Sequence, residues 1–147
     1  MTDLWQYLKS ADKPILLYGT GNGADKILNE LQKLNIPVRG VFASDGFVRN
    51  RDFRGYHVLS FEEAQKQFGD MIALVSFGTQ LPEVIGNIKR ISALCEVYAP
   101  DVPVIEDGEI FNSSYYEKHK TEIETAREIL ADEQSVKVFD SIISYKL

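Results

Sequence analysis

The sequence predicts an α/β protein: a short, mostly parallel sheet of four or five strands with helices on both faces, followed by C-terminal helices. Short, continuous apolar runs recur along the chain, as in strands that are buried on both sides. Segments with apolar residues at helical spacing alternate with these runs. This alternation favours a parallel sheet, because right-handed crossovers place the connecting helices on its two faces.

The first half of the sheet is predicted around a glycine-rich turn. Residues 14–18 (PILLY) are an apolar run that ends at this turn, which is typical of a buried strand. A helix follows, since apolar residues recur at helical spacing from Ala24 to Leu34 before Pro37 ends the pattern. Residues 38–43 are expected to form the next strand.

A second strand–helix–strand unit follows a polar loop at residues 44–55. Ser60 and Glu63 have the spacing of a capping box, which predicts a helix that ends at Gly69. Residues 71–77 (MIALVSF) then form another apolar run, which we interpret as a third buried strand.

The rest of the chain changes from sheet to helices. Pro82 occupies the expected first position of a helix, and residues 96–99 form a fourth short strand. Residues 104–105 either extend the sheet or cross its edge. Residues 113–130 and 135–145 are predicted to be two helices, the second amphipathic. We expect the last helix to pair with another copy or to lead into a further domain, rather than to dock on the sheet.

Length, charge and cysteine content exclude several classes of function. A chain of 147 residues is one ordinary domain, and its formal net charge of −6 gives no basic surface for duplex nucleic acid or an anionic membrane. The single cysteine, Cys95, excludes an internal disulfide. The sequence has no run of about 18 apolar residues and its first residues have no export signal, so we expect a cytoplasmic location.

The turn between the first strand and the first helix carries the chemistry. Residues 19–24 (GTGNGA) fit the G-x-G-x-x-A pattern of Rossmann-like nucleotide-binding sheets. Gly19 permits the tight turn, Gly21 lets a phosphate approach the backbone, and Ala24 lets the helix lie close to the strand. Asp45, after the second strand, could accept hydrogen bonds from ribose hydroxyls. The alternative is that the glycines only form a turn and Asp45 only begins a loop.

Two further segments are candidates for the same site. Residues 76–79 follow the third strand and should face the same crevice, although they could equally form a polar turn and helix cap. Arg49, Arg51 and Arg54 are a possible phosphate clamp, or a solvated loop. No catalytic set and no metal site can be assembled. The candidate ligand-binding residues are Gly19, Thr20, Gly21, Asn22, Gly23, Asp45, Ser76, Phe77 and Gly78.

Four segments carry a resemblance to a known family. The runs LLYGTGNGADKIL, GVFASDGFVRNRDFRGYHV, LVSFGT and EILADEQSVKVFDSIISYKL resemble the region upstream of the catalytic domain in FkbM-type sugar methyltransferases. The first part is also similar to the nucleotide-sugar-binding domain ahead of some hexapeptide-repeat sugar acetyltransferases. The resemblance implies an accessory domain at residues 1–107 and, at residues 108–147, a connector to a methyltransferase domain that this chain lacks.

Together these features predict a non-catalytic domain that recognises a nucleotide or a nucleotide sugar. One alternative is a structural or dimerisation domain with a vestigial crevice. Another is a methyltransferase that uses S-adenosylmethionine directly, but the turn has Leu17 where such enzymes usually carry an acidic residue. NAD is also less favoured, because a half-sized sheet lacks the second mononucleotide unit.

Overall fold

A computed structural model describes residues 3–48, 51–105 and 108–147 of the chain. It divides into two compact units, Lys9–Val102 and the pair of segments Met1–Leu8 with Pro103–Leu147. The first unit contains the sheet and the second contains the C-terminal helices. The predicted α/β class, with a mostly parallel sheet followed by helices, is confirmed.

The sheet has six strands in the order β3-β4-β2-β1-β5-β6. Every neighbouring pair is parallel except the β3–β4 hairpin at one edge. The strands are β1 (Ile15–Tyr18), β2 (Val38–Phe42), β3 (Asp52–Phe53), β4 (Tyr56–Leu59), β5 (Ile72–Val75) and β6 (Glu96–Tyr98). The central strands β1 and β5 are buried along their whole length, as continuous apolar runs require.

The expected count of four or five strands was too low because of the hairpin. β3 has only two residues and falls inside the segment expected to be a polar loop. Arg54 and Gly55, both with positive φ, make the turn, and β4 then buries Val58 alongside β2. Residues 104–105, one of whose expected roles was to extend the sheet, are not a strand, and both side chains are exposed.

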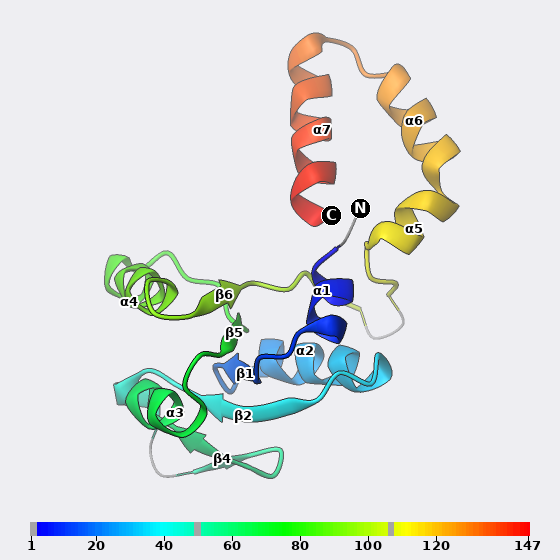
Figure 1. Ribbon diagram of the computed structural model, residues 1–147. Helices are drawn as coiled ribbons and strands as arrows, with labels where there is room; N and C mark the ends of the chain where they lie inside the picture. The colour runs from blue at the N-terminus through cyan, green and yellow to red at the C-terminus, as the bar shows by residue number, and fades with distance from the viewer. Residues whose placement is uncertain (1–2, 49–50, 106–107) are drawn as a thin grey trace. The chain divides into compact units, whose positions relative to one another are not determined.

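Helices cover both faces of the sheet, as predicted. Figure 1 shows α2 (Asn22–Lys33) on one side of the strands, and α3 (Phe61–Phe68) and α4 (Pro82–Ser92) on the other. The capping box of Ser60 and Glu63 is present, with both of its hydrogen bonds. Pro82 is the first residue of α4, where its missing N–H leaves no intrahelical bond unmade.

The core on the α3 and α4 side is built around aromatic rings. Tyr18 is 1% exposed, and its ring stacks on Phe42 with centroids 4.7 Å apart. Phe77 meets the same ring edge-on at 5.0 Å, and Phe61 of α3 packs against Phe42. These contacts fix the orientation of Tyr18 at the end of β1.

The second unit is helical. The helix α1 (Leu4–Ser10) was not expected, and Asp3 caps it by accepting a hydrogen bond from the Gln6 amide at 2.8 Å. Residues 113–130, expected to be one helix, form α5 (Ser113–Lys118) and α6 (Lys120–Glu128), because the backbone of His119 (φ −110, ψ 16) departs from helical geometry. α7 (Glu133–Lys146) agrees with the prediction.

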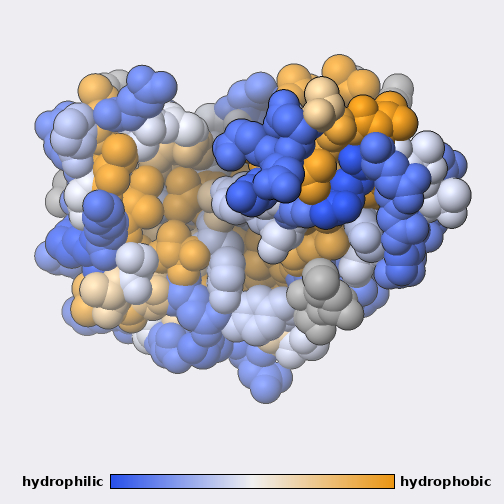
Figure 2. All heavy atoms as spheres, turned by 90° about the horizontal axis from the view of Figure 1, so that it is seen from above, coloured by the Kyte–Doolittle hydropathy of each residue, from blue (hydrophilic) through white to orange (hydrophobic). Residues whose placement is uncertain are grey.

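The helices α5, α6 and α7 bury few of their side chains. None of their side chains is fully buried, and Val138, Ile142 and Tyr145 of α7 are about half exposed or more. Hydrophobic atoms lie open among hydrophilic ones on the face of the molecule drawn in Figure 2. Among the described residues, no helix has the length and apolar character needed to cross a membrane.

Candidate functional site

A cavity of about 650 Å³ lies at the carboxyl ends of the central strands. The chain leaves β1 toward β2 on one side, and β5 lies on the other side of β1, so the strand order reverses between β1 and β5. Ligands of open α/β sheets bind at such a switch point. The cavity is lined by Tyr18, Gly19, Thr20, Gly21, Ala43, Ser44, Gly46, Phe47, Arg51, Phe77, Gly78, Thr79, Leu81, Glu83, Val84 and Asn87.

Both the backbone conformation and the neighbouring side chains require glycine at position 19. Its φ of +113° lies in the region that side chains rarely adopt. A Cβ there would lie 2.5 Å from the Ser76 hydroxyl oxygen and 2.8 Å from the Phe77 ring. Its amide donates to the Phe42 carbonyl at 2.9 Å, which extends the sheet into the turn. The predicted tight turn at Gly19 therefore has two independent structural causes.

Gly21 leaves the start of α2 open. A Cβ at this position would meet no atom within 4 Å, and no side chain caps the helix. The amides of Ala24 and Asp25 donate to the Gly21 carbonyl, at 3.0 and 3.2 Å. Within the described part of the chain, the preceding amides of Asn22 and Gly23 have no such partner. Free amides and the helix dipole together favour an anion here.

Gly23 packs the helix onto the sheet rather than lining the cavity. A Cβ at Gly23 would lie 2.0 Å from the Ser76 carbonyl oxygen, so α2 touches the end of β5 backbone to backbone. This packing role was expected of Ala24, which is also fully buried. The small residue at the point of closest approach is thus one position earlier than expected.

The residues after β5 have two different roles: one stabilises the sheet and the next two line the cavity. Ser76 is buried, and its hydroxyl donates to the Tyr18 carbonyl at 2.8 Å, which ties the ends of β1 and β5 together. Phe77 and Gly78 line the cavity, as expected of its second wall. The structure therefore brings the glycine turn and the β5 loop together, with Ser76 behind the cavity surface.

The arginines of the predicted phosphate clamp contact different groups in the structure. Arg51 lines the cavity, and its guanidinium donates to the Thr20 hydroxyl. Arg54 instead pairs with Asp25 on the first turn of α2 at 2.6 Å, and this hydrogen bond raises the pKa of Arg54. Arg49 lies outside the described residues.

Asp45, the predicted ribose partner, begins a short 3₁₀ helix (Asp45–Phe47), but its side chain lies outside the described part of the structure. The same loop supplies Phe47, which lines the cavity and is 62% exposed. Leu81, 58% exposed, lies in the opposite loop before α4. The cavity thus has an apolar side chain in each of its two flanking loops.

Four polar residues that line the cavity were not expected from the sequence: Tyr18, Ser44, Glu83 and Asn87. Tyr18 was counted only as the end of a buried strand, and Ser44 only as the start of a loop. Asn87 interrupts the apolar spacing of α4, one residue before Ile88. Asn87 could have been found from the sequence, because it is a polar residue on the inward face of a predicted helix. Among the described residues, no group of three or more His, Cys, Asp or Glu side chains could hold a metal ion.

No protein-family model and no curated protein matches the chain. Two solved structures are similar to it: RSP, a Rex-family repressor, and RSP in complex with beta-NADH. The first has a TM-score of 0.41 and 16% identity, over 85% of this chain and 66% of that one. The second has a TM-score of 0.41 and 15% identity, over 78% and 63%. The chain therefore spans less than two thirds of the length of each RSP chain.

Proposed function

We propose that the unit Lys9–Val102 is a recognition domain that binds a nucleotide by placing a phosphate at the start of α2. The observation that supports it most directly is the open space at Gly21, which faces a cavity of about 650 Å³ at the strand-order reversal. An uncapped helix start supplies backbone N–H donors there. Anion recognition in an acidic chain needs such local donors, because the overall charge opposes it.

The size and surfaces of the cavity favour a nucleotide over a small inorganic anion. A volume of this order falls within the range typical of sites for small organic molecules and cofactors. Phe47 and Leu81 offer apolar surface in the two flanking loops. A ligand that has a phosphate in the middle and less polar groups attached to it matches this distribution.

Among the described residues, Arg51 is the cationic side chain that lines the cavity, and we assign it to the phosphate. It already reaches the glycine turn through the Thr20 hydroxyl. A guanidinium offers several donors in a fixed plane, so it can hold Thr20 and a phosphate oxygen together. Arg54 is engaged with Asp25 and takes no part in this assignment.

The wider role that we propose is that of a non-catalytic accessory domain, similar to those of FkbM-type methyltransferases, whose ligand is a nucleotide or nucleotide sugar. Neither His nor Cys is among the residues that line the cavity in the described part of the chain. The ionisable side chains described there are Arg51, Glu83 and Tyr18, and they form no nucleophile–base pair. Methyl transfer would then belong to a following domain joined through α7.

Isothermal titration calorimetry on the full chain tests this proposal. The panel contains ADP, UDP, a nucleotide sugar of each, NADH and S-adenosylmethionine. We expect at least one nucleotide to bind and Gly21→Ala to weaken it at least about tenfold, because the added methyl occupies the space that the phosphate needs. No heat from any nucleotide up to millimolar concentration would contradict the proposal. Binding of S-adenosylmethionine alone would favour the direct methyltransferase instead.

A second candidate function, self-association, is favoured by the surface of α7. Val138, Ile142 and Tyr145 lie at helical spacing and are exposed. Apolar stripes of this kind commonly bury themselves against another helix. Light scattering on the full chain and on Val138→Glu/Ile142→Glu tests this candidate. A wild-type monomer at high concentration would eliminate it.

A further inference from the structure

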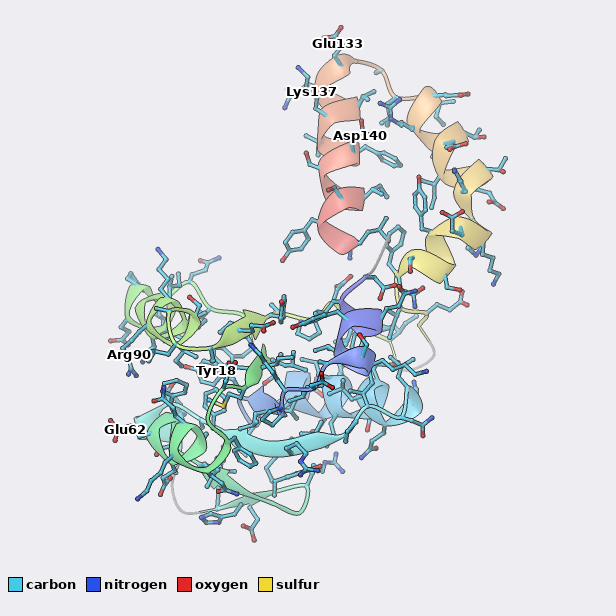
Figure 3. The ribbon with its side chains drawn as sticks, viewed as in Figure 1. Tyr18, Glu62, Arg90, Glu133, Lys137 and Asp140 are labelled. Carbon is cyan, nitrogen blue, oxygen red and sulfur yellow. The ribbon has the colours of Figure 1, made fainter. Side chains whose placement is uncertain are left out.

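Two hydroxyl groups meet at the floor of the cavity. The Tyr18 hydroxyl and the Ser44 hydroxyl are 2.6 Å apart, a short hydrogen bond between the ends of two neighbouring strands. The ring of Tyr18 is held between Phe42 and Phe77, so its hydroxyl has a fixed position. In Figure 3, Tyr18 lies at the sheet, inward of Arg90 on α4 and Glu62 on α3. This hydroxyl pair is therefore preorganised rather than a chance surface contact.

Asn87 of α4 completes a polar group around this pair. A second, smaller cavity of about 20 Å³ shares Tyr18, Ser44 and Asn87 with the main one, and Arg90 also lines it. A space of this size can hold a single water-sized group. The guanidinium of Arg90 lies over the Phe61 ring, 5.8 Å from its centroid. The floor thus has room for one hydroxyl-sized group, beside the neutral donors and acceptors of Tyr18, Ser44 and Asn87 and next to Arg90.

A space of about 20 Å³ is too small for a phosphate, and the hydroxyl and amide groups of this floor suit a hydroxyl of the ligand. Two hydroxyls that share one hydrogen bond retain one O–H hydrogen and several lone pairs, and the Asn87 amide adds both donors and an acceptor. Tyr18, Ser44 and Asn87 carry no formal charge. Groups that donate and accept at once, as sugar hydroxyls do, satisfy such a floor.

We propose that Tyr18, Ser44 and Asn87 recognise the ribose hydroxyls of the bound nucleotide and select ribonucleotides over deoxyribonucleotides. The inference rests on the proposed function, because it assumes a phosphate at the glycine turn. Tyr18 directly precedes Gly19, and ribose is the group bonded directly to the phosphate of a nucleotide. The hydroxyl pair then does the work that sequence analysis gave to Asp45.

The test combines changes in the protein with changes in the ligand. Calorimetry compares ADP and UDP with their 2′-deoxy and 3′-deoxy forms, on the wild-type chain and on Tyr18→Phe, Ser44→Ala and Asn87→Leu. Tyr18→Phe keeps the stacked ring and removes only the hydroxyl, which protects the fold. Asp45→Asn is the matched control for recognition by a carboxylate.

We expect the wild-type chain to prefer a ribonucleotide over a deoxy form about three- to tenfold, the effect of one net hydrogen bond. Tyr18→Phe and Ser44→Ala should remove this preference while changing the affinity for the deoxy form less than about twofold. Equal binding of ribo and deoxy forms by the wild type would overturn this inference and leave the proposed function standing. So would loss of the preference in Asp45→Asn alone. Absence of binding to every form would overturn both.

Discussion

The close contact between Gly23 and Ser76 predicts that a larger residue at position 23 lowers the free energy of unfolding. In Gly23→Ala, the new Cβ would lie 2.0 Å from the Ser76 carbonyl oxygen, whereas ordinary contact begins at 3.4 Å. The start of α2 and the end of β5 would therefore have to separate by about 1.4 Å. Both atoms at the contact belong to or adjoin the backbone, so no side-chain rotation relieves the overlap.

The expected cost follows from two opposing effects. Overpacking of this severity costs about 3 kcal/mol. Replacing glycine by alanine inside a helix raises the free energy of unfolding by up to about 1 kcal/mol. We therefore expect Gly23→Ala to lose about 2 kcal/mol of unfolding free energy, which in a domain of roughly 100 residues lowers Tm by about 8–16 °C.

Gly21→Ala is the matched control, two residues earlier in the same turn. Its Cβ would meet nothing within 4 Å, and the φ of −96° is open to any residue. We expect a loss of about 0.5 kcal/mol, because alanine is a poorer helix cap than glycine. Urea denaturation followed by far-UV circular dichroism measures both variants. If Gly23→Ala is as stable as Gly21→Ala, the close packing of α2 on β5 is wrong.

Three further predictions follow. Arg51→Ala should weaken nucleotide binding about fivefold and reduce its dependence on salt in calorimetry, since one charge–phosphate contact is lost; unchanged affinity would remove Arg51 from the site. Ser60→Ala should lower the unfolding free energy by about 1 kcal/mol in urea titrations, because the capping box is broken, and Gln65→Ala is its neutral control. Burial raises the pKa of Asp3, but hydrogen bonds from the Ser113 hydroxyl and the Gln6 amide outweigh it, so the net pKa lies below 3.8. Asp3→Ala should therefore destabilise the helical unit at pH 7, and the difference from wild type should shrink as pH falls below about 3.8; hydrogen exchange in α1 that is the same in both proteins at pH 7 would contradict it.

The sheet and its glycine turn could be predicted because their sequence signals are local. Buried parallel strands require continuous apolar runs, and residues 15–18 and 72–75 are such runs. The turn itself needs the positive φ of Gly19, and Gly21 leaves the start of the helix open, so both positions belong to one short motif. Signals of this kind need no knowledge of distant contacts.

The features that escaped prediction depend on distant or very short segments. β3 is too short to show a period, and α1 offers only Trp5 and Leu8 as buried positions. The break at His119 changes one backbone conformation without interrupting the apolar spacing. The hydroxyl pair joins residues 26 positions apart, so it exists only once β1 and β2 lie side by side.

The β3–β4 hairpin has a consequence for how the turn responds to its surroundings. Arg51 and Arg54 flank β3, and they reach Thr20 and Asp25 on either side of the helix start. Both contacts are exposed, and ions in solution screen the attraction between the charges of Arg54 and Asp25. The attachment of this edge hairpin to the ligand-facing turn thus weakens as ionic strength rises, whereas the hydrogen bonds between the strands do not depend on salt in this way. Crystals grown from concentrated salt and protein in dilute buffer should therefore differ first in this hairpin.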